Sequence, residues 1–237
     1  MHEVLLVYKQ IEMLFDDNGE LFIPAAEHDV HTYSYDEKPG IQAISSTGKD
    51  LNPTTKCGTI KRDYEYKRLG TVSLLAAIDL LTGEAIPLVR DKHTSDEFID
   101  FLKILNEKYP EGDIIRVILD NYTVHTSKKV KAFFATMPGR FIFIFTPKHG
   151  SWLNMIEGFF GKMTRQMLKG IRVSSKQELI DRIYKLIYCL LVVKSFAKLS
   201  SRKIRILRFV GIYFCMKFTE REVKLVSWNL GFQFSKD

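Results

Sequence analysis

The sequence predicts an α/β fold, a mixed β-sheet with helices on its faces. Three apolar runs, at residues 71–83, 114–120 and 141–146, have the length and the β-branched or aromatic content of buried strands. Segments with helical spacing or helix-capping residues lie between and after these runs. Because strands come first as a group and then alternate with helices, this order favours a mixed sheet with right-handed crossovers.

Earlier elements precede these runs. A helix is predicted over residues 4–15, where apolar positions recur with helical spacing. Residues 31–36 predict a short strand that ends in an acid, and Pro39-Gly40 separates it from a second strand over residues 41–45. Residues 46–68 are polar and predict a surface loop. The apolar face of the first helix consists of Val4, Tyr8, Ile11 and Phe15.

Turn and cap residues delimit the middle of the chain. Thr82-Gly83 predicts a hairpin turn that leads into a strand over residues 84–90. Either Thr94 or Ser95 is expected to cap a helix that runs through Leu105, because acidic residues occupy its first turn.

Two more helices follow the later strands. Thr126 or Ser127 is expected to start a helix through Thr136, and Ser151 to cap a long helix that Gly170 ends. The long helix should bury one apolar stripe against the sheet. That stripe consists of Trp152, Ile156, Phe159, Met163 and Met167.

The composition fits one sizeable domain. The chain has 237 residues, of which 46% are hydrophobic and 27% charged, and a core of this size needs no disulfide staples. The three cysteines are far apart and odd in number, which excludes a disulfide framework and favours a reducing compartment. We find no signal peptide and no apolar run long enough to cross a bilayer.

The last part of the chain has a different texture. A helix predicted from Ser175 to about Tyr188 leads into a tail over residues 188–237 that holds ten basic and three acidic residues. This tail alone accounts for the net charge of +7, so basicity says little about the main domain. We expect it to pack poorly and to leave apolar side chains partly exposed. They include Phe209, Tyr213, Phe214 and Phe218.

Three acids stand at the places where an α/β sheet collects ligands. Asp36 and Asp120 each end a predicted strand, and Glu157 lies on the helix after the next strand. Carboxylates there suit a hard divalent cation such as Mg²⁺, and two such ions serve phosphoryl chemistry. The alternative is that each acid caps a helix or forms a turn, which is the commoner role of an acid after a strand.

The sequence segments around these acids resemble those of a known family. They read YSYDEKPGIQAI at 33–44, VILDNYTVHTSK at 117–128 and FTPKHGSWLNMIEGFFGKMTRQ at 145–166, with RDYEYKRLGTVSLLAAIDLLTGEAIPLV at 62–89. Thirty-six residues separate Asp120 from Glu157. Over roughly residues 3–187 the chain resembles the catalytic domain of DDE-type insertion-sequence transposases of the mariner superfamily.

The resemblance implies a ribonuclease H-like fold shared with retroviral integrases, with Asp36, Asp120 and Glu157 as the metal-binding triad. It implies Mg²⁺, with Mn²⁺ as a substitute, and two ions. The implied reaction is hydrolysis at transposon ends, followed by attack of a 3′-hydroxyl on target DNA, at a TA dinucleotide. The implied partners are DNA and a second copy of the complete protein, without a membrane, in the bacterial cytoplasm and at the nucleoid.

Neighbours of the triad are candidate DNA-binding or supporting residues, each with a plainer alternative. Asn121 orients Asp120 or a phosphate, or is a turn residue; His125 approaches the scissile phosphate, or caps or packs. Asn154 shares a helical face with Glu157, and Trp152 stacks on a base or, as we favour, is buried. The candidates are Asn121, His125, Lys148, His149, Asn154, Lys162 and Arg165.

Three features depart from the family pattern. The family carries N-terminal helix-turn-helix modules, whereas this chain starts where a linker should lie, and its tail lacks the family's ending. Tyr122 stands where many relatives have histidine. We therefore expect residues 1–30 to form a linker helix and loop, residues 31–187 the catalytic domain, and residues 188–237 an atypical basic tail that a frameshift would explain.

Three functions remain open at this point. The first is an active transposase catalytic domain, favoured by the intact triad. The second is a catalytically inactive or truncated remnant with residual DNA binding, favoured by the odd tail. The third is a stand-alone nuclease of the same fold, which would cut unrelated DNA.

Overall fold

The computed structural model describes residues 2–15, 21, 28–55, 58–61, 63–148 and 150–198, the last nine of these by backbone alone. The chain divides into two compact units, Met1–Asp181 and Arg182–Asp237. The sheet and all the candidate site residues that the structure describes belong to the first unit.

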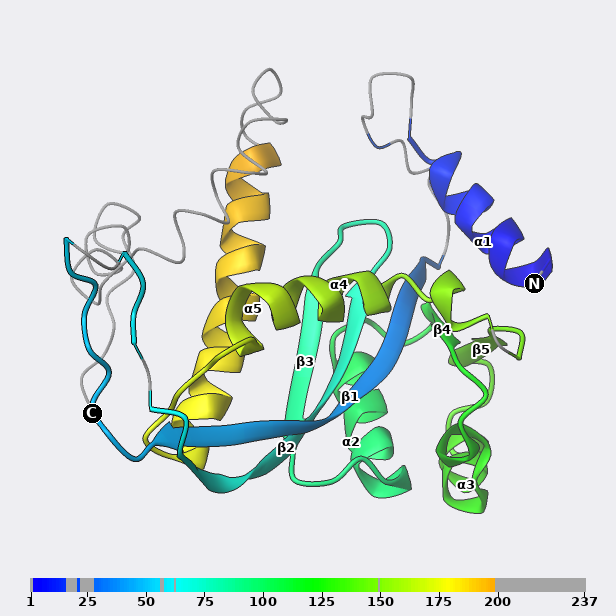
Figure 1. Cartoon of the computed structure of the whole chain (residues 1–237). Helices are drawn as coiled ribbons and strands as arrows, with labels where there is room; N and C mark the ends of the chain where they lie inside the picture. Colours follow the sequence, from blue (N-terminus) through cyan, green and yellow to red (C-terminus); the bar gives the residue numbers. More distant parts are fainter. Residues whose placement is uncertain are drawn as a thin grey trace, which may run out of the picture. The chain divides into compact units, whose positions relative to one another are not determined.

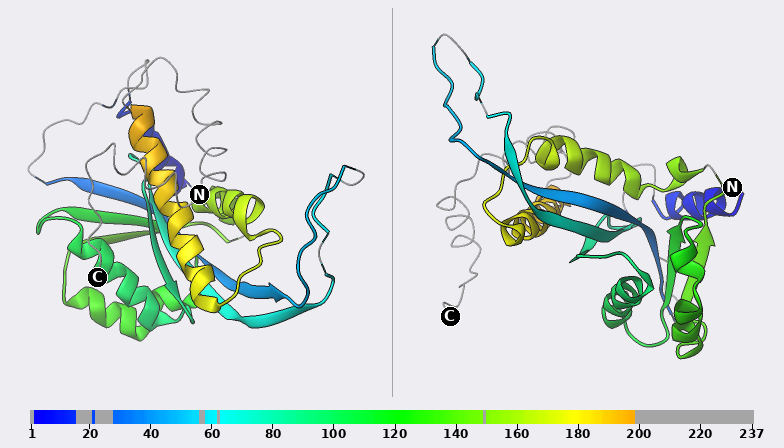
Figure 2. Two further views of the ribbon diagram at one scale, coloured as in Figure 1. Left: turned by 90° about the vertical axis from the view of Figure 1, so that its left-hand side faces the viewer. Right: turned by 60° about the horizontal axis from the view of Figure 1, so that its bottom comes forward.

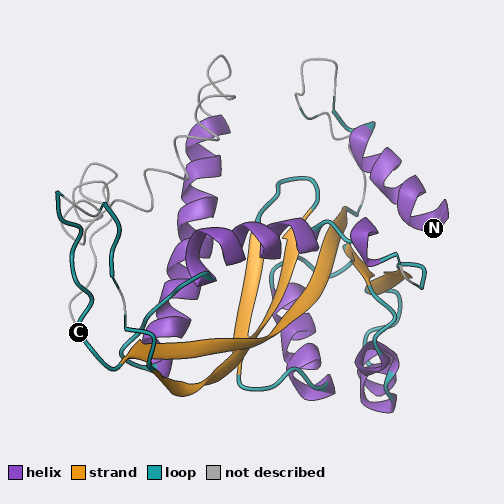
Figure 3. Cartoon of the chain, viewed as in Figure 1, coloured by secondary structure: helices purple, strands orange, loops and turns teal. Residues whose placement is uncertain are grey.

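The first unit is built on a five-stranded mixed sheet, as predicted (Figures 1 and 3). The strand order is β3-β2-β1-β4-β5. Strand β2 runs antiparallel to β1 and β3, whereas β4 runs parallel to β1 and β5. The strands are β1 (Val30–Ser46), β2 (Tyr66–Asp79), β3 (Ala85–Arg90), β4 (Ile114–Leu119) and β5 (Phe141–Phe145). The hairpin turn predicted at Thr82-Gly83 joins β2 to β3, and Gly83 adopts a φ of 67° there.

Strand β1 corrects the expectation of two short strands. It is one strand of 17 residues, and its pairing with β2 shifts register between Lys38 and Ile41. Pro39 and Gly40 lie inside this bulge, where Pro39 needs no ladder hydrogen bond and Gly40 adopts a φ of +67°. Pro39 and Gly40, which predicted a break between two strands, therefore mark a bulge within one continuous strand.

Two helices cover one face of the sheet. They are α2 (Ser95–Glu107) and α3 (Lys128–Ala135), which begin at the predicted caps Thr94 and Ser127. Thr94 and Glu97 form a capping box, so the start of α2 has its backbone donors satisfied. The core on this face includes Tyr33, Tyr35, Leu75, Phe98, Phe101, Leu102, Leu105, Val117, Leu119 and Val130.

Helices α1 (His2–Glu12) and α4 (Ile156–Met163) lie on the other face, as the second view in Figure 2 shows. The first helix ends three residues earlier than predicted. Its Val4 and Val7 pack with Ile118 and Ile144 of the sheet, and the Tyr8 hydroxyl donates to the Leu153 carbonyl at 2.5 Å. The predicted helix of the linker thus packs into the core of this unit.

The single long helix predicted over residues 151–170 is wrong. The chain forms a 3₁₀ turn (Ser151–Leu153), then α4, then a π-helical turn (Thr164–Leu168), and Gly170 ends the series with a φ of 73°. Ile156 and Met163 are buried as predicted, but Trp152 is 70% exposed and does not belong to the core. The break falls at Asn154, whose backbone is extended.

The predicted end of the last helix is also wrong. Helix α5 (Lys176–Lys198) continues past Tyr188, so the change in composition there does not end it. The aromatic residues named in the tail lie outside the described residues. No helix in the described part of the chain has the length and apolarity needed to cross a bilayer.

Candidate active site

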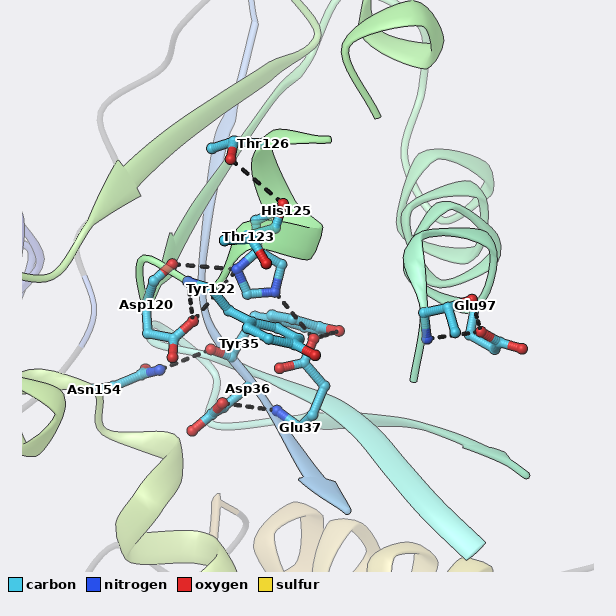
Figure 4. A network of polar contacts seen from close by, with 11 residues as sticks. Tyr35, Asp36, Glu37, Glu97, Asp120, Tyr122, Thr123, His125, Thr126 and Asn154 are labelled. Atoms are coloured by element: carbon cyan, nitrogen blue, oxygen red, sulfur yellow. Dashed lines mark hydrogen bonds and ion pairs between the residues drawn. The ribbon is translucent and has the colours of Figure 1, made fainter. Parts of the chain in front are cut away.

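Asp36 and Asp120 lie side by side in the sheet register. The parallel pairing of β1 with β4 ends at Ser34 and Ile118, and each acid lies two residues further along the chain. Because side chains alternate along a strand, both acids face the side of Ser34 and Ile118, which α4 covers. Figure 4 shows both carboxylates on the side of Asn154. Asp120 directly follows the last residue of β4, close to the predicted strand end, whereas Asp36 lies within β1.

Glu157 approaches this pair from α4. It lies in the first turn of that helix and is exposed, whereas its neighbours Ile156 and Phe160 are buried. Its backbone N–H donates to the Asn154 carbonyl at 3.1 Å. Because the Glu157 side chain is exposed, a change of rotamer would not disturb the packing of α4.

The three acids interact electrostatically. Burial, together with the negative charges of Glu37, Asp120 and Glu157, raises the pKa of Asp36 to about 7, although a hydrogen bond from the Glu37 N–H at 2.8 Å opposes this rise. No cationic side chain in the described part of the chain forms an ion pair with Asp36. A bound cation would supply a positive partner.

This pKa predicts how the metal-free protein responds to pH. Because the folded-state value exceeds the unfolded value of about 3.9, Asp36 stabilises the fold at low pH, and this contribution disappears as pH rises from about 4 through 7. In the presence of a chelator, we expect the free energy of unfolding, measured with urea, to fall by about 1–3 kcal/mol over this pH range.

The Asp36→Asn variant should lack that slope, and saturating Mg²⁺ should remove it from the wild type. The Asp100→Asn variant on α2 is the matched control and should keep the slope. An unchanged slope in Asp36→Asn would assign it to other groups.

Asp120 has the opposite environment. A hydrogen bond to His125 holds the pKa of Asp120 below its usual range, and the Tyr122 N–H adds another at 3.0 Å. Asp120 Oδ1 lies 3.4 Å from His125 Nδ1, and the side chain is 42% exposed. Asp120 therefore stays ionised at neutral pH while it remains open to a ligand.

His125 is buried beneath the acids, so it packs inside the fold rather than approaching a phosphate. Its Nε2 lies 3.0 Å from Glu37 Oε1, and its Nδ1 lies 3.2 Å from the Asp120 carbonyl (Figure 4). Tyr35 donates its hydroxyl to the same Glu37 oxygen at 2.8 Å. Burial alone would lower the pKa of His125, but its bonds with Asp120 and Glu37 raise it to about 9.

Sequence reasoning missed Glu37 and Tyr35. Glu37 alternates with Asp36 along β1, so it points to the α2 face, where its side chain is 7% exposed. The consecutive acids Asp36 and Glu37 did indicate that β1 places a carboxylate on each face of the sheet. The negative charge of the buried Glu37 is balanced by His125, which lies 88 residues away in the sequence.

Asn154 does not share a helical face with Glu157, because it precedes α4. It is 2% exposed. Its amide donates to the Tyr35 carbonyl at 2.7 Å, and its side-chain oxygen accepts from the Ser34 hydroxyl. Ser34 Oγ also accepts from the Ile156 N–H at 3.0 Å. Asn154 is therefore a buried link between β1 and α4.

The other candidates divide by exposure. Asn121 donates its amide to the Thr146 carbonyl, which ties the ends of β4 and β5 together and supports the turn role. Lys148, Lys162 and Arg165 are exposed. His149 lies outside the described residues. A methyl group added at Gly158 would meet nothing within 4 Å, so tight packing does not require that glycine.

Among the described residues, no three His, Cys, Asp or Glu side chains are already grouped as a metal cage. The donor set nevertheless fits a hard cation, since Asp36, Asp120 and Glu157 offer oxygen atoms only. Two of them share one register level, and the third is exposed and unencumbered by packing.

Comparisons with known proteins agree with this geometry. The family described as DDE superfamily endonuclease matches residues 35–180. A protein of Shigella sonnei, "Insertion element IS630 uncharacterized 39 kDa protein", is 26% identical over 110 residues, which are 46% of this chain and 32% of that protein. The chain thus spans about a third of that relative's length.

Solved structures share the fold. The Mos1 mariner paired-end complex with Mn aligns with a TM-score of 0.52 at 13% identity, over 92% of this chain and 62% of that one. The Mos1 transposase paired-end complex with left transposon end aligns with a TM-score of 0.51 at 13% identity, over 92% of this chain and 61% of that one. The predicted ribonuclease H-like architecture is confirmed.

Proposed function

The chain belongs to the DDE superfamily endonucleases, and we propose that it is the catalytic domain of a transposase that cuts DNA at transposon ends and transfers the strands to target DNA. The observation that carries this proposal is the register of Asp36 and Asp120 beside the first turn of α4, which presents Glu157. The names of the matched insertion-element protein and of the paired-end complexes support the same activity.

We propose that Asp36, Asp120 and Glu157 hold divalent metal, with Mg²⁺ as the natural ion, Mn²⁺ as a substitute and two ions in the working site. Bound metal would activate the attacking oxygen and stabilise the leaving oxygen of a phosphodiester. The chain's own residues fix the ligands. The Glu37 N–H holds Asp36, whereas the Tyr122 N–H and His125 hold Asp120.

DNA is the proposed substrate and partner, with a TA target and a homodimer as the working assembly of the complete protein. Two exposed cations, Lys162 on α4 and Arg165 in the π-helical turn that follows it, lie beyond Glu157 in the chain and are proposed to contact phosphates. Lys148 precedes the same element and is proposed to act with them.

The test of the function is strand cleavage on DNA that carries the inverted repeats flanking the coding region. We expect cleavage in Mg²⁺ or Mn²⁺ and none in a chelator. Scrambled DNA of equal length is the control, and it should be cut far more slowly. Equal cutting of both substrates would favour a stand-alone nuclease. Metal-independent or absent cleavage of the end-containing DNA would contradict the proposal.

The proposed DNA contacts predict a change in salt dependence. The double variant Lys162→Ala/Arg165→Ala should reduce the slope of log affinity against log salt by about 1.4–1.8, because each lost phosphate contact contributes about 0.7–0.9. Fluorescence anisotropy at several salt concentrations measures this slope. The matched control, Lys128→Ala/Lys131→Ala, removes two exposed cations from α3 on the opposite face. An equal loss in both variants would show that binding follows net charge alone.

A further inference from the structure

We propose that Ser34 and Asn154 form a positioning clamp that sets Glu157 relative to Asp36, a role that rests on the proposed metal-dependent function. Neither residue can contact DNA or metal in this structure, because Ser34 is 0% and Asn154 2% exposed. Both lie between the two elements that carry the acids. Their effect on the site must therefore pass through backbone position.

The clamp consists of hydrogen bonds that run from β1 to α4. The Ser34 hydroxyl donates to the Asn154 side-chain oxygen and accepts from the Ile156 N–H at 3.0 Å. The Asn154 amide donates to the Tyr35 carbonyl at 2.7 Å. Tyr35 is adjacent to Asp36, and Ile156 is adjacent to Glu157, so the bonds end one residue away from each acid.

The clamp also determines where α4 begins. Asn154 has φ −85° and ψ 105°, which is extended backbone, and its carbonyl accepts from the Glu157 N–H at 3.1 Å. An unbroken helix would direct the Asn154 side chain along the helix surface. Because the break turns that side chain into the sheet, Glu157 falls in the first turn of a helix whose start is fixed to β1.

This arrangement is complementary to the His125 network on the opposite face. Asp120 and Asp36 are placed together by strand register, whereas Glu157 comes from a separate element and needs its own anchor. In metal sites, residues that orient ligands change metal affinity by about 10–100-fold when they are removed. The clamp should have an effect of that size.

The first experiment measures backbone order in the metal-free protein by hydrogen exchange. In Ser34→Ala we expect the amide of Ile156 to exchange at least about tenfold faster, since it loses its acceptor, while amides of α2 keep their protection. Asn154→Ala keeps the backbone carbonyl that accepts from the Glu157 N–H, but it removes the side-chain bonds to Ser34 and Tyr35 that hold this carbonyl in place, so the Glu157 amide should also exchange faster. Unchanged exchange at both amides would overturn the clamp without reference to metal.

The second experiment measures Mn²⁺ affinity by calorimetry, well below the unfolding temperature. We expect Ser34→Ala and Asn154→Ala to bind Mn²⁺ about 10–100-fold more weakly, and the conservative Ser34→Thr variant, which keeps the hydroxyl, to recover most of the affinity. Cleavage of end-containing DNA should fall in kcat with little change in KM. Asn154→Asp keeps the side-chain size and the acceptor oxygen, and serves if Asn154→Ala fails to fold.

The matched control is Ser73→Ala. Ser73 is a buried serine on the adjacent strand β2, is 3% exposed, and shares a hydrogen bond of 3.1 Å with His93 Nδ1. It should lose stability but bind Mn²⁺ like the wild type. Wild-type affinity in Ser34→Ala, or an equal loss in Ser73→Ala, would overturn the clamp alone. A wild-type chain that binds no Mn²⁺ would instead overturn the proposed function on which the clamp rests.

Discussion

Replacement of any of the three acids, as Asp36→Asn, Asp120→Asn or Glu157→Gln, is expected to abolish cleavage of end-containing DNA, with a loss of at least about 10³-fold. Each substitution keeps the shape of the side chain and removes one anionic ligand. Loss of transition-state charge stabilisation of this kind costs about 4 kcal/mol or more. A quantitative cleavage assay in Mg²⁺, repeated in Mn²⁺, measures the effect.

At Asp36, the substitution that abolishes activity should increase the stability of the metal-free protein. Asp36 is a half-buried carboxylate that three negative neighbours disfavour, so Asp36→Asn should unfold at a higher urea concentration than the wild type in a chelator at pH 8. Loss of activity with gain of stability separates a functional acid from a structural one. Glu84→Gln is the control, because Glu84 pairs with Lys108 on the surface and should affect neither property strongly. Near-wild-type cleavage in any triad variant would remove that acid from the site.

The sequence was sufficient for the order and type of nearly all the core elements. Runs such as 114–119 and 141–145 combine β-branched or aromatic residues with clear flanking turns, and these local signals agree with the observed strands. The capping residues Thr94 and Ser127 also act locally, so their helices start where predicted. The observed pairing of β1 with β4 then places Asp36 and Asp120 beside each other.

Two errors have one physical cause: contacts distant in sequence override local signals. The long helix expected after Ser151 breaks at Asn154, because that side chain bonds to Ser34, 120 residues away. The break turns Trp152 to solvent, although the helical spacing predicted its burial. Likewise, β1 runs through Pro39-Gly40 because pairing with β2 on both sides of the bulge holds it together.

The sequence predicts the three acids of the site but not the residues that hold them in place. A carboxylate at a strand end can be predicted from the sequence, because the strand end itself can be predicted. The balance of charge beneath the acids cannot be predicted in this way, since it depends on which face Glu37 takes and on where the turn after β4 places His125. That turn is the 3₁₀ segment Thr123–Thr126, which buries the histidine.

The second large effect is expected at His125 and concerns stability. The His125 side chain is 0% exposed and the Glu37 side chain 7%, so His125→Ala leaves a buried carboxylate whose remaining side-chain partner is the Tyr35 hydroxyl. Removal of one partner from a buried ion pair costs about 3–5 kcal/mol. Urea unfolding at pH 7 should show a loss of that order, together with weaker protection of the β4 end that carries Asp120.

The same pair predicts a pH window. The pKa of His125 in the folded protein is about 9, above the value of about 6.5 in the unfolded chain. Its contribution to stability is therefore complete below about pH 6.5 and is lost as pH rises through 9. The wild type should lose about 2–3 kcal/mol across that interval, whereas His125→Gln should show a flatter profile.

A double-mutant cycle distinguishes this pairing from simple packing. If His125 stabilises the fold by neutralising Glu37, then Glu37→Gln/His125→Gln should be less destabilised than the sum of its two single variants, with a coupling of about 1–3 kcal/mol. His93→Ala is the matched control, since that histidine bonds to the Ser73 hydroxyl and to no carboxylate among the described contacts. It should lose less stability than His125→Ala. Additive single variants, or an equal loss at His93, would mean that His125 contributes by volume alone and that Asp120 is held in place without it.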